Sequence, residues 1–246
     1  MYTRYIRQID LPEIDIAGQE KIAQGRILII GAGGLGVPAA LYLAGAGVKT
    51  IGLADQDTVS LSNLHRQIIY REEDIGKNKI DVCARELRLL NTDINIDTYN
   101  TLINSDNIDD ILPDYDIVLD CCDNFETRFT INEACFKHAK PLISASVHHF
   151  DGQIMTLRPS TENDLPCYQC LFPHMPEDGS IPKCSEAGVF GPTVGTIGCL
   201  QAGQALKTLL GLNPEEAQYI LNINLLTLDF VKMQFFARPD CPVCQS

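Results

Sequence analysis

Two pairs of cysteines have the spacing of a metal site. Cys167 and Cys170 form the sequence CYQC, and Cys241 and Cys244 form CPVC close to the end of the sequence. Two such pairs can supply four thiolates to one zinc ion, which leaves no open position for water. A redox pair is the alternative, but a redox CxxC normally opens a helix near the start of a thioredoxin-like unit. The pattern therefore predicts a structural Zn²⁺ site that ties the C-terminal segment to the body.

The remaining cysteines divide into two groups. Most stand in apolar runs, and we expect these to be small core residues. Cys184 instead stands in PHMPEDGSIPKCSEAG, where prolines and glycines predict a loop, and it forms no CxxC with another cysteine. The expected core residues are Cys83, Cys121, Cys122, Cys135 and Cys199.

Charged and amide side chains gather in two neighbouring stretches. DQDTVSLSNLHRQ contains Asp55, Asp57, Asn63 and Arg66, and Lys79 follows in GKNKI. Cationic groups placed beyond a ribose-binding carboxylate favour a triphosphate over a nicotinamide ring as the ligand. The alternative is that Arg66 and Lys79 are solvated surface charges, as most arginines and lysines are.

A carboxylate after a later apolar run can hold a metal ion. Ile117 to Leu119 have the composition of a strand and lead into DCCDN, which contains Asp120 and Asp123. Ligands of open α/β sheets bind outside the carboxyl ends of the strands, where Mg²⁺ often takes one protein carboxylate and substrate phosphates. Capping of a helix that begins near Phe125 is the alternative role. We assign Asp120 to structure and Asp123 to Mg²⁺.

The elements that would position these groups form a nucleotide-binding βαβ unit. The strand-like run ILII leads into GAGGLG, a helical pattern follows, and the second strand TIGLAD ends at Asp55. Such a loop allows close approach of backbone to phosphate, and the strand-end carboxylate suits ribose hydroxyls. The fingerprint alone does not separate NAD, FAD and ATP. Its glycines are Gly31, Gly33, Gly34 and Gly36.

Composition excludes some other classes of protein. The 246 residues suit an α/β domain, and a net charge of −13 without a basic run argues against nucleic acid as a partner. The start MYTRYIRQID has no apolar run of a secretory signal, so we expect a cytoplasmic location. The stretch from Ala187 to Leu206 has no charge, but its glycines and glutamines predict helix packing inside a non-membrane protein.

Taken together, the motifs resemble those of the bacterial E1-like family that contains ThiF, MoeB and HesA. The resemblance implies a doubly wound, Rossmann-like, mostly parallel α/β sheet with C-terminal antiparallel strands and a zinc site of four cysteines. It implies one adenylation domain over residues 1–246, with a nucleotide-binding half at about 1–145 and a carrier-binding and zinc half at about 146–246. The matching stretches are RYIRQI, GAGGLG, DQDTVSLSNLHRQ, DCCDNFETR, CYQC, KCSEAGVFGP and CPVC.

The resemblance also implies roles for single residues. Asp55 would hold the ATP ribose, with Asp57 and Asn63 in the same pocket. Arg66 and Lys79 would bind the phosphates and Asp123 would bind Mg²⁺. Arg7 of the RQI motif would reach into the ATP site of a neighbouring subunit, which implies a homodimer. Cys184 is the position at which ThiF-like members carry a cysteine for covalent sulfur transfer, whereas MoeB-like members can carry one there without needing it.

The activity implied by the family is adenylation of a protein carboxylate. The substrate would be the C-terminal Gly-Gly of a ubiquitin-like sulfur carrier, with a cysteine desulfurase or another protein as sulfur donor. Because that carboxylate is already ionised at neutral pH, no general base is needed, and we assign the histidines to structure or surface. Details of PAALYLAGAGV, EDIGKNK and CYQCLFP favour a ThiS-type carrier of thiamine synthesis, with a MoaD-type carrier of molybdopterin synthesis as the alternative.

Two other classes of function stay open at this point. An NAD-dependent oxidoreductase would share the glycine loop but would not need Arg66, Lys79 or DCCDN. A catalytically silent binding partner would be expected to lack those charged groups. The apolar stretch from Ile220 to Phe236 suits either a carrier interface or packing within a sheet.

Overall fold

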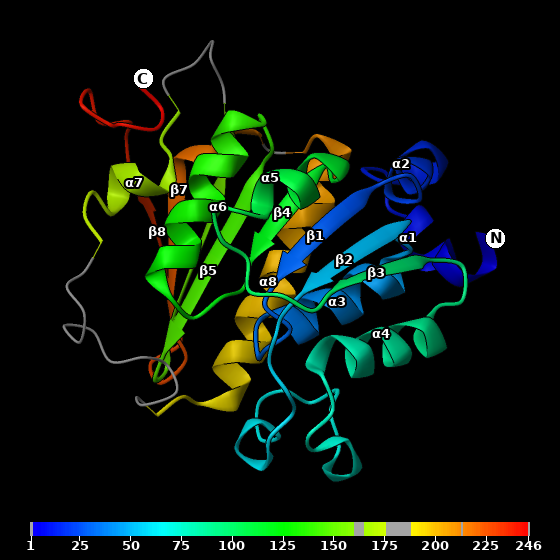
Figure 1. Ribbon diagram of the computed structural model, residues 1–246. Helices are drawn as coiled ribbons and strands as arrows, with labels where there is room; N and C mark the ends of the chain where they lie inside the picture. The colour runs from blue at the N-terminus through cyan, green and yellow to red at the C-terminus, as the bar shows by residue number, and fades with distance from the viewer. Residues whose placement is uncertain (1, 160–164, 176–187, 213, 246) are drawn as a thin grey trace.

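One eight-stranded sheet forms the centre of the molecule, in the strand order β3-β2-β1-β4-β5-β6-β7-β8 (Figure 1). The computed structural model describes residues 2–159, 165–175, 188–212 and 214–245. The strands are β1 (Arg26–Ile30), β2 (Thr50–Ala54), β3 (Asn95–Tyr99), β4 (Ile117–Asp120), β5 (Leu142–His148), β6 (Asp151–Leu157), β7 (Tyr219–Asn224) and β8 (Asp229–Gln234).

The sheet changes from parallel to antiparallel pairing at β5. Strands β3, β2, β1, β4 and β5 pair in parallel, whereas the pairs from β5 through β8 are antiparallel. The predicted fold class, a mostly parallel doubly wound sheet with C-terminal antiparallel strands, is confirmed. The division predicted near residue 145 lies within β5, the strand at which the pairing changes.

Helices cover both faces of the parallel part, which explains why β1 and β4 are almost continuously apolar, whereas the edge strand β3 is not. In β1, Ile27 and Ile29 pack into the core on the side of α3, α4 and α8, and Leu28 and Ile30 pack into the core on the side of α5 and α6 (Figure 1). The longer helices are α2 (Asp15–Ile22), α3 (Gly36–Ala46), α4 (Lys79–Leu90), α6 (Phe125–Lys137) and α8 (Gly191–Leu210).

Short helical turns join these elements. They are η1 (Tyr2–Tyr5), α1 (Ile6–Ile9), η2 (Leu61–Asn63), η3 (Glu72–Asp74), α5 (Ile108–Ile111), η4 (Leu112–Asp114), α7 (Tyr168–Leu171) and η5 (Pro214–Gln218).

The charge-free stretch that ends at Leu206 forms most of α8, which packs against α3 and β5. A Cβ on Gly198 would lie 2.4 Å from the carbonyl oxygen of Leu35, so the small residue permits close contact. The Gln201 side chain donates to the carbonyl oxygens of Asp120 and Ile143 at 2.9 and 3.1 Å, which links α8 to β4 and β5. No helix of the described chain is long and apolar enough to cross a membrane.

Candidate nucleotide site and metal centre

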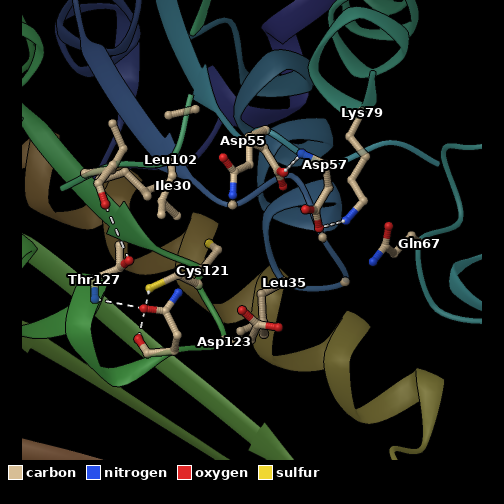
Figure 2. Close-up of a pocket in the computed structure, with 18 of the residues that line it drawn as sticks. Ile30, Leu35, Asp55, Asp57, Gln67, Lys79, Leu102, Cys121, Asp123 and Thr127 are labelled. Atoms are coloured by element: carbon tan, nitrogen blue, oxygen red, sulfur yellow. Dashed lines mark hydrogen bonds and ion pairs between the residues drawn. The ribbon is translucent and has the colours of Figure 1, made fainter. Parts of the chain in front are cut away.

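A cavity of about 340 Å³ lies at the carboxyl ends of β1, β2 and β4 (Figure 2). In the sheet, β2 and β3 lie on one side of β1, whereas β4 lies on its other side. The cavity therefore stands at the point where the strand order reverses. Open α/β sheets bind ligands in this crevice. Of the residues predicted to bind nucleotide or metal, the following line it: Gly31, Gly33, Gly34, Asp55, Asp57, Asn63, Arg66, Lys79 and Asp123.

The glycine loop is tight because its first and last glycines meet. Gly31 has φ of +103°, and a Cβ there would lie 2.6 Å from the carbonyl oxygen of Cys121. A Cβ on Gly36 would lie 1.9 Å from the carbonyl oxygen of Gly31. Gly36 is the first residue of α3 and lies outside the cavity lining, so its place is in loop packing rather than in ligand contact.

The Asp55 carboxylate organises the loop beside β2. Its Oδ2 accepts the backbone N–H of Ala32 and its Oδ1 that of Asp57, each at 2.8 Å. Burial raises the pKa of Asp55, and the positive charge of Lys79 and the two backbone hydrogen bonds oppose that shift. A carboxylate fixed in this way still has lone pairs for ribose hydroxyls.

Lys79 enters the cavity from the first turn of α4 and is paired with Asp57 (Figure 2). The Lys79 Nζ lies 2.8 Å from Asp57 Oδ2, and the Lys79 side chain is 7% exposed against 62% for Asp57. Because the cation is buried and the anion is largely solvated, a bound phosphate can replace the carboxylate without stranding Asp57.

Asn63 and Arg66 come from one short segment after β2. The Asn63 side chain accepts the backbone N–H of Ser60 at 3.2 Å, which closes the turn of η2. Arg66 donates from Nη1 to the carbonyl oxygen of Ser62 at 2.9 Å and lies 2.8 Å from His65 Nε2. These contacts hold the Arg66 guanidinium at the cavity wall.

Asp120 and Asp123 lie in different surroundings, and helix capping falls to a third residue. Asp120 is buried at the end of β4, and Asn124 caps α6 by accepting the N–H of Thr127 at 2.8 Å. Asp123 is exposed to the cavity and has no hydrogen bond or ion pair within the described residues. It is therefore free to bind a cation.

An ion pair behind the cavity holds the turn that carries Asp123. The Arg128 Nη1 lies 2.9 Å from Asp120 Oδ2, which also accepts the Ser144 hydroxyl at 2.7 Å. The same guanidinium donates to the carbonyl oxygens of Cys122 and Ala145. These contacts thus tie α6, through Arg128, and β5, through Ser144 and Ala145, to the carboxyl end of β4.

Two of the predicted core cysteines are only partly buried. Cys83, Cys121 and Cys135 are buried, but Cys122 is partly exposed and lines the cavity, and Cys199 is also partly exposed. Cys122 stands two residues past the end of β4, where it packs partly buried against the core and also faces the cavity. Burial, followed by the nearby charge of Asp120, raises the pKa of the Cys122 thiol well above its usual range.

Sequence reasoning missed two other lining residues, Gln67 and Arg128. Gln67 is buried, and its Oε1 accepts no hydrogen bond from the part of the chain that the structure describes. The motif DQDTVSLSNLHRQ ends on Gln67, which was the available signal. The stretch DCCDNFETR likewise ends on Arg128, which was the available signal for this residue.

One predicted catalytic residue is not brought to the cavity of its own chain. Arg7 is 94% exposed, lies outside the lining, and makes an ion pair with Asp10 at 3.7 Å. Cys184 lies outside the described residues.

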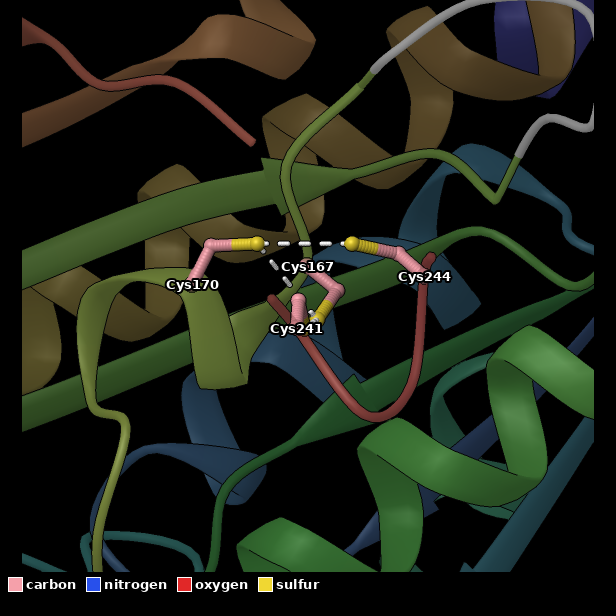
Figure 3. Close-up of side chains that lie close together, drawn as sticks. All are labelled: Cys167, Cys170, Cys241 and Cys244. Carbon is pink, nitrogen blue, oxygen red and sulfur yellow. Dashed lines mark hydrogen bonds between the residues drawn. The ribbon is translucent and has the colours of Figure 1, made fainter. Parts of the chain in front are cut away.

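The two CxxC pairs come together as predicted, with all four sulfurs within 4.8 Å of one another (Figure 3). Sulfur distances are 4.0 Å within the first pair, 3.5 Å from Cys167 to Cys241 and 3.4 Å from Cys170 to Cys244. Zn–S bonds of about 2.3 Å in a tetrahedron place sulfurs about 3.8 Å apart, so the dimensions are consistent with zinc.

The thiols of this cluster differ in pKa. Burial and the adjacent Cys170 raise the pKa of Cys167 to about 12. Burial acts in the same direction on Cys241, but the N–H groups of Cys244 and Val243 and a neighbouring thiol lower its pKa to about 7. A divalent cation would supply the charge that lets all four sulfurs ionise together.

Comparison with known proteins agrees with this geometry. The model of the ThiF family matches residues 5–243. The chain is 41% identical over 243 residues to the sulfur carrier protein adenylyltransferase of Thermus thermophilus, covering 98% of this chain and 90% of that protein. It is 37% identical over 241 residues to the SAMP-activating enzyme E1 of Haloferax volcanii, covering 98% and 88%.

A longer relative and a solved structure also match the chain. The adenylyltransferase and sulfurtransferase uba4 of Emericella nidulans is 41% identical over 256 residues, which is 100% of this chain and 53% of that protein. A crystal structure of E. coli MccB with MccA-N7isoASN has a TM-score of 0.84 at 23% identity, covering 100% of this chain and 75% of that one, and this likeness shows the fold. From the family match and these identities, the chain belongs to the ThiF family.

Proposed function

We propose that this protein is an ATP-dependent adenylyltransferase that activates the C-terminal carboxylate of a ubiquitin-like sulfur-carrier protein. The observation that carries the proposal is the cavity, in which Arg66, Lys79 and Asp123 stand beyond a glycine loop, Asp123 without a partner among the described residues. The names of the two relatives that match nearly the whole chain, one acting on a sulfur carrier and one on SAMP, support the substrate class.

The proposed reaction joins two anions. A carboxylate oxygen of the carrier attacks the α-phosphorus of ATP, the bond from this phosphorus to the bridging oxygen breaks, and pyrophosphate leaves with that electron pair. The products are the carrier acyl-adenylate and pyrophosphate. Since both reactants are negative, catalysis requires positive charge around the phosphates more than a proton acceptor.

The described side chains fit these requirements. Asp55 would bind the ribose, with Asp57 and Asn63 beside it, and Arg66 and Lys79 would screen the phosphates. Asp123 fits Mg²⁺, because it is an exposed carboxylate on the cavity wall while Asp120 is occupied by Arg128. Bound Mg²⁺ would neutralise phosphate charge.

Arg7 is proposed to act in the site of a second copy of the chain. Its side chain is almost fully exposed and lies outside the cavity of its own chain. Mixing Arg7→Ala and Asp123→Ala proteins tests this, because half of the mixed dimers' sites would have both residues. Recovered pyrophosphate exchange supports the homodimer with shared sites. Absence of recovery, with subunit exchange verified, rejects it.

The carrier is proposed to dock on β8. This strand is the edge of the sheet within the described chain, and its Phe230, Val231 and Met233 are 54%, 49% and 51% exposed. An edge strand can pair with the sheet of a ubiquitin-like protein, while apolar side chains add contact area. Of the two roles open to the apolar stretch from Ile220 to Phe236, a carrier interface is thus favoured for β8. Packing within the sheet applies to Ile220 and Ile223 of β7, which are buried.

The position of β8 sets the length of the carrier tail. It lies four strands from β4, and at about 4.8 Å per strand the separation is about 19 Å. An extended chain covers about 3.3 Å per residue, so roughly six residues should span from the docked domain to the cavity. Val231→Glu should raise the KM for the carrier and leave the KM for ATP unchanged. Leu89→Glu, at an exposed apolar residue of α4, is the matched control.

The proposal extends to the type of carrier and to the transfer of sulfur. We favour a ThiS-type carrier, with a MoaD-type carrier as the alternative, and the names of the relatives do not separate them. Cys184 is proposed as a residue for covalent sulfur transfer with the carrier, served by a cysteine desulfurase or another donor. Cys184→Ser should then keep adenylation and lose transfer of sulfur.

The deciding experiment is ATP–pyrophosphate exchange with purified ThiS-type and MoaD-type carriers side by side. Carrier-dependent exchange that disappears in Asp123→Ala supports the proposed function, and the more efficient carrier identifies the type. Exchange that persists undiminished in Asp123→Ala or Arg66→Ala would remove the assigned roles. Tighter binding of NAD than of ATP would favour an oxidoreductase.

A further inference from the structure

Tyr70 makes a contact with the glycine loop that the proposed reaction has not used. Its side chain is buried, and its hydroxyl donates to the carbonyl oxygen of Ala32 at 2.7 Å. Ala32 also donates its backbone N–H to Asp55 Oδ2 at 2.8 Å. Both polar backbone atoms of this residue are therefore held by side chains from outside the loop.

The carbonyl bond fixes the direction of the next backbone N–H. The carbonyl of Ala32 and the N–H of Gly33 belong to one trans peptide, in which the two groups point in opposite directions. Gly33 lines the cavity and Tyr70 does not. The N–H of Gly33 has no acceptor within the described residues. Holding the carbonyl on the Tyr70 side thus leaves this N–H as a donor on the cavity side.

The same hydrogen bond joins the two halves of the phosphate site. Tyr70 follows the segment that carries Asn63 and Arg66, and its own N–H donates to the carbonyl oxygen of Gln67 at 3.2 Å. Gln67 and Arg66 in turn donate their backbone N–H groups to the carbonyl oxygen of Asn63, each at 3.0 Å. A displacement of the glycine loop relative to Arg66 would break the Tyr70 contact.

The hydroxyl stays a donor throughout the working pH range. Burial, with smaller effects of Cys83 and of the negative charges of Asp55 and Asp57, raises the pKa of Tyr70. A neutral tyrosine keeps its proton, so the bond to Ala32 does not depend on the ionisation of the other groups at the site.

We propose that Tyr70 is a positioning residue that holds the glycine loop so that the Gly33 N–H faces a phosphate of the nucleotide. This inference rests on the proposed nucleotide substrate. It predicts that the Tyr70 hydroxyl acts on phosphate binding and not on binding of the adenosine portion, because Asp55 keeps its own contacts.

The test is equilibrium binding of ATP and of adenosine to the Tyr70→Phe protein, which needs no carrier. Loss of the hydroxyl leaves a buried carbonyl oxygen unpaired, and we expect ATP affinity to fall about tenfold. Adenosine affinity should change by less than about twofold. The matched control is Tyr115→Phe, which removes a buried hydroxyl bonded to Tyr99 and Asp97, outside the cavity.

The outcomes separate the inference from the function on which it rests. Unchanged ATP affinity in a folded Tyr70→Phe protein overturns the positioning role. Equal losses of ATP and adenosine affinity, or equal losses in Tyr115→Phe, overturn it as well, because they indicate general loosening. If the wild-type protein bound ATP but catalysed no carrier-dependent exchange, the proposed function would fail while the binding result still decided the role of Tyr70.

Discussion

The ion pair between Asp120 and Arg128 should dominate the stability of the nucleotide-binding part. The two side chains are 1% and 8% exposed and 2.9 Å apart. In Arg128→Met the Asp120 carboxylate stays buried and keeps the Ser144 hydroxyl and a Cys122 contact, but loses its positive partner. Breaking one half of a buried pair costs about 3–5 kcal/mol. Loss of the guanidinium also leaves the carbonyl oxygens of Cys122 and Ala145 without this donor.

The assay is urea denaturation followed by circular dichroism. We expect the free energy of unfolding of Arg128→Met to fall by about 3–5 kcal/mol, and the midpoint of thermal unfolding by roughly 6–20 °C at 2–4 °C per kcal/mol. Arg238→Met is the control, because its partner Asp240 is 73% exposed and the bridge should be worth about 0–1 kcal/mol. A loss in Arg128→Met no larger than in the control would refute the reasoning.

The remaining predictions concern acid, metal and charge. Hydrogen bonds from Arg85, followed by burial acting in the opposite direction, leave the pKa of Asp74 lowered to about 2. Its stabilisation is therefore present above about pH 4 and lost as pH falls towards 2, so the deficit of Asp74→Asn in urea denaturation should shrink between pH 7 and pH 3. Removal of zinc by a chelator should lower the thermal midpoint by more than about 10 °C, and Cys241→Ser should not respond further. Lys79→Met should reduce pyrophosphate exchange about a hundredfold or more with an unchanged unfolding midpoint, whereas loss of folding would remove the catalytic interpretation.

The parts of the fold that follow from sequence are those in which chain order and spatial order coincide. The glycine loop directly follows the run ILII of β1, and only α3 and β2 lie between that loop and Asp55. The parallel pairing of β1 with β2 then sets the ends of these two strands side by side. The two CxxC pairs were predictable despite their separation, because four thiols have few other uses in such spacing.

The contacts that sequence did not predict are made by ordinary residue types, either between distant segments or among neighbours of equal propensity. Tyr70 reaches Ala32 across 38 positions, and nothing in the local pattern of Tyr70 distinguishes a hydrogen-bonded tyrosine from any buried one. Asn124 was overlooked as the helix cap because two aspartates nearby have the same capping ability. The first residue of α6 selects Asn124 as its cap, whereas only tertiary packing selects the partner of Tyr70.

Charged side chains are paired in the core of this molecule but not throughout the cavity. Buried Asp120 is paired with Arg128, and buried Asp74 with Arg85 and Lys77. At the cavity, in contrast, Asp123 has no described partner and the Gly33 N–H no described acceptor. The solvated Asp123 carboxylate and the Gly33 N–H are therefore available to a ligand that carries a cation and phosphate oxygens, as Mg²⁺–ATP does. The buried cation of Lys79 has a solvated partner that phosphate can displace, so binding need not strand a charge in the interior.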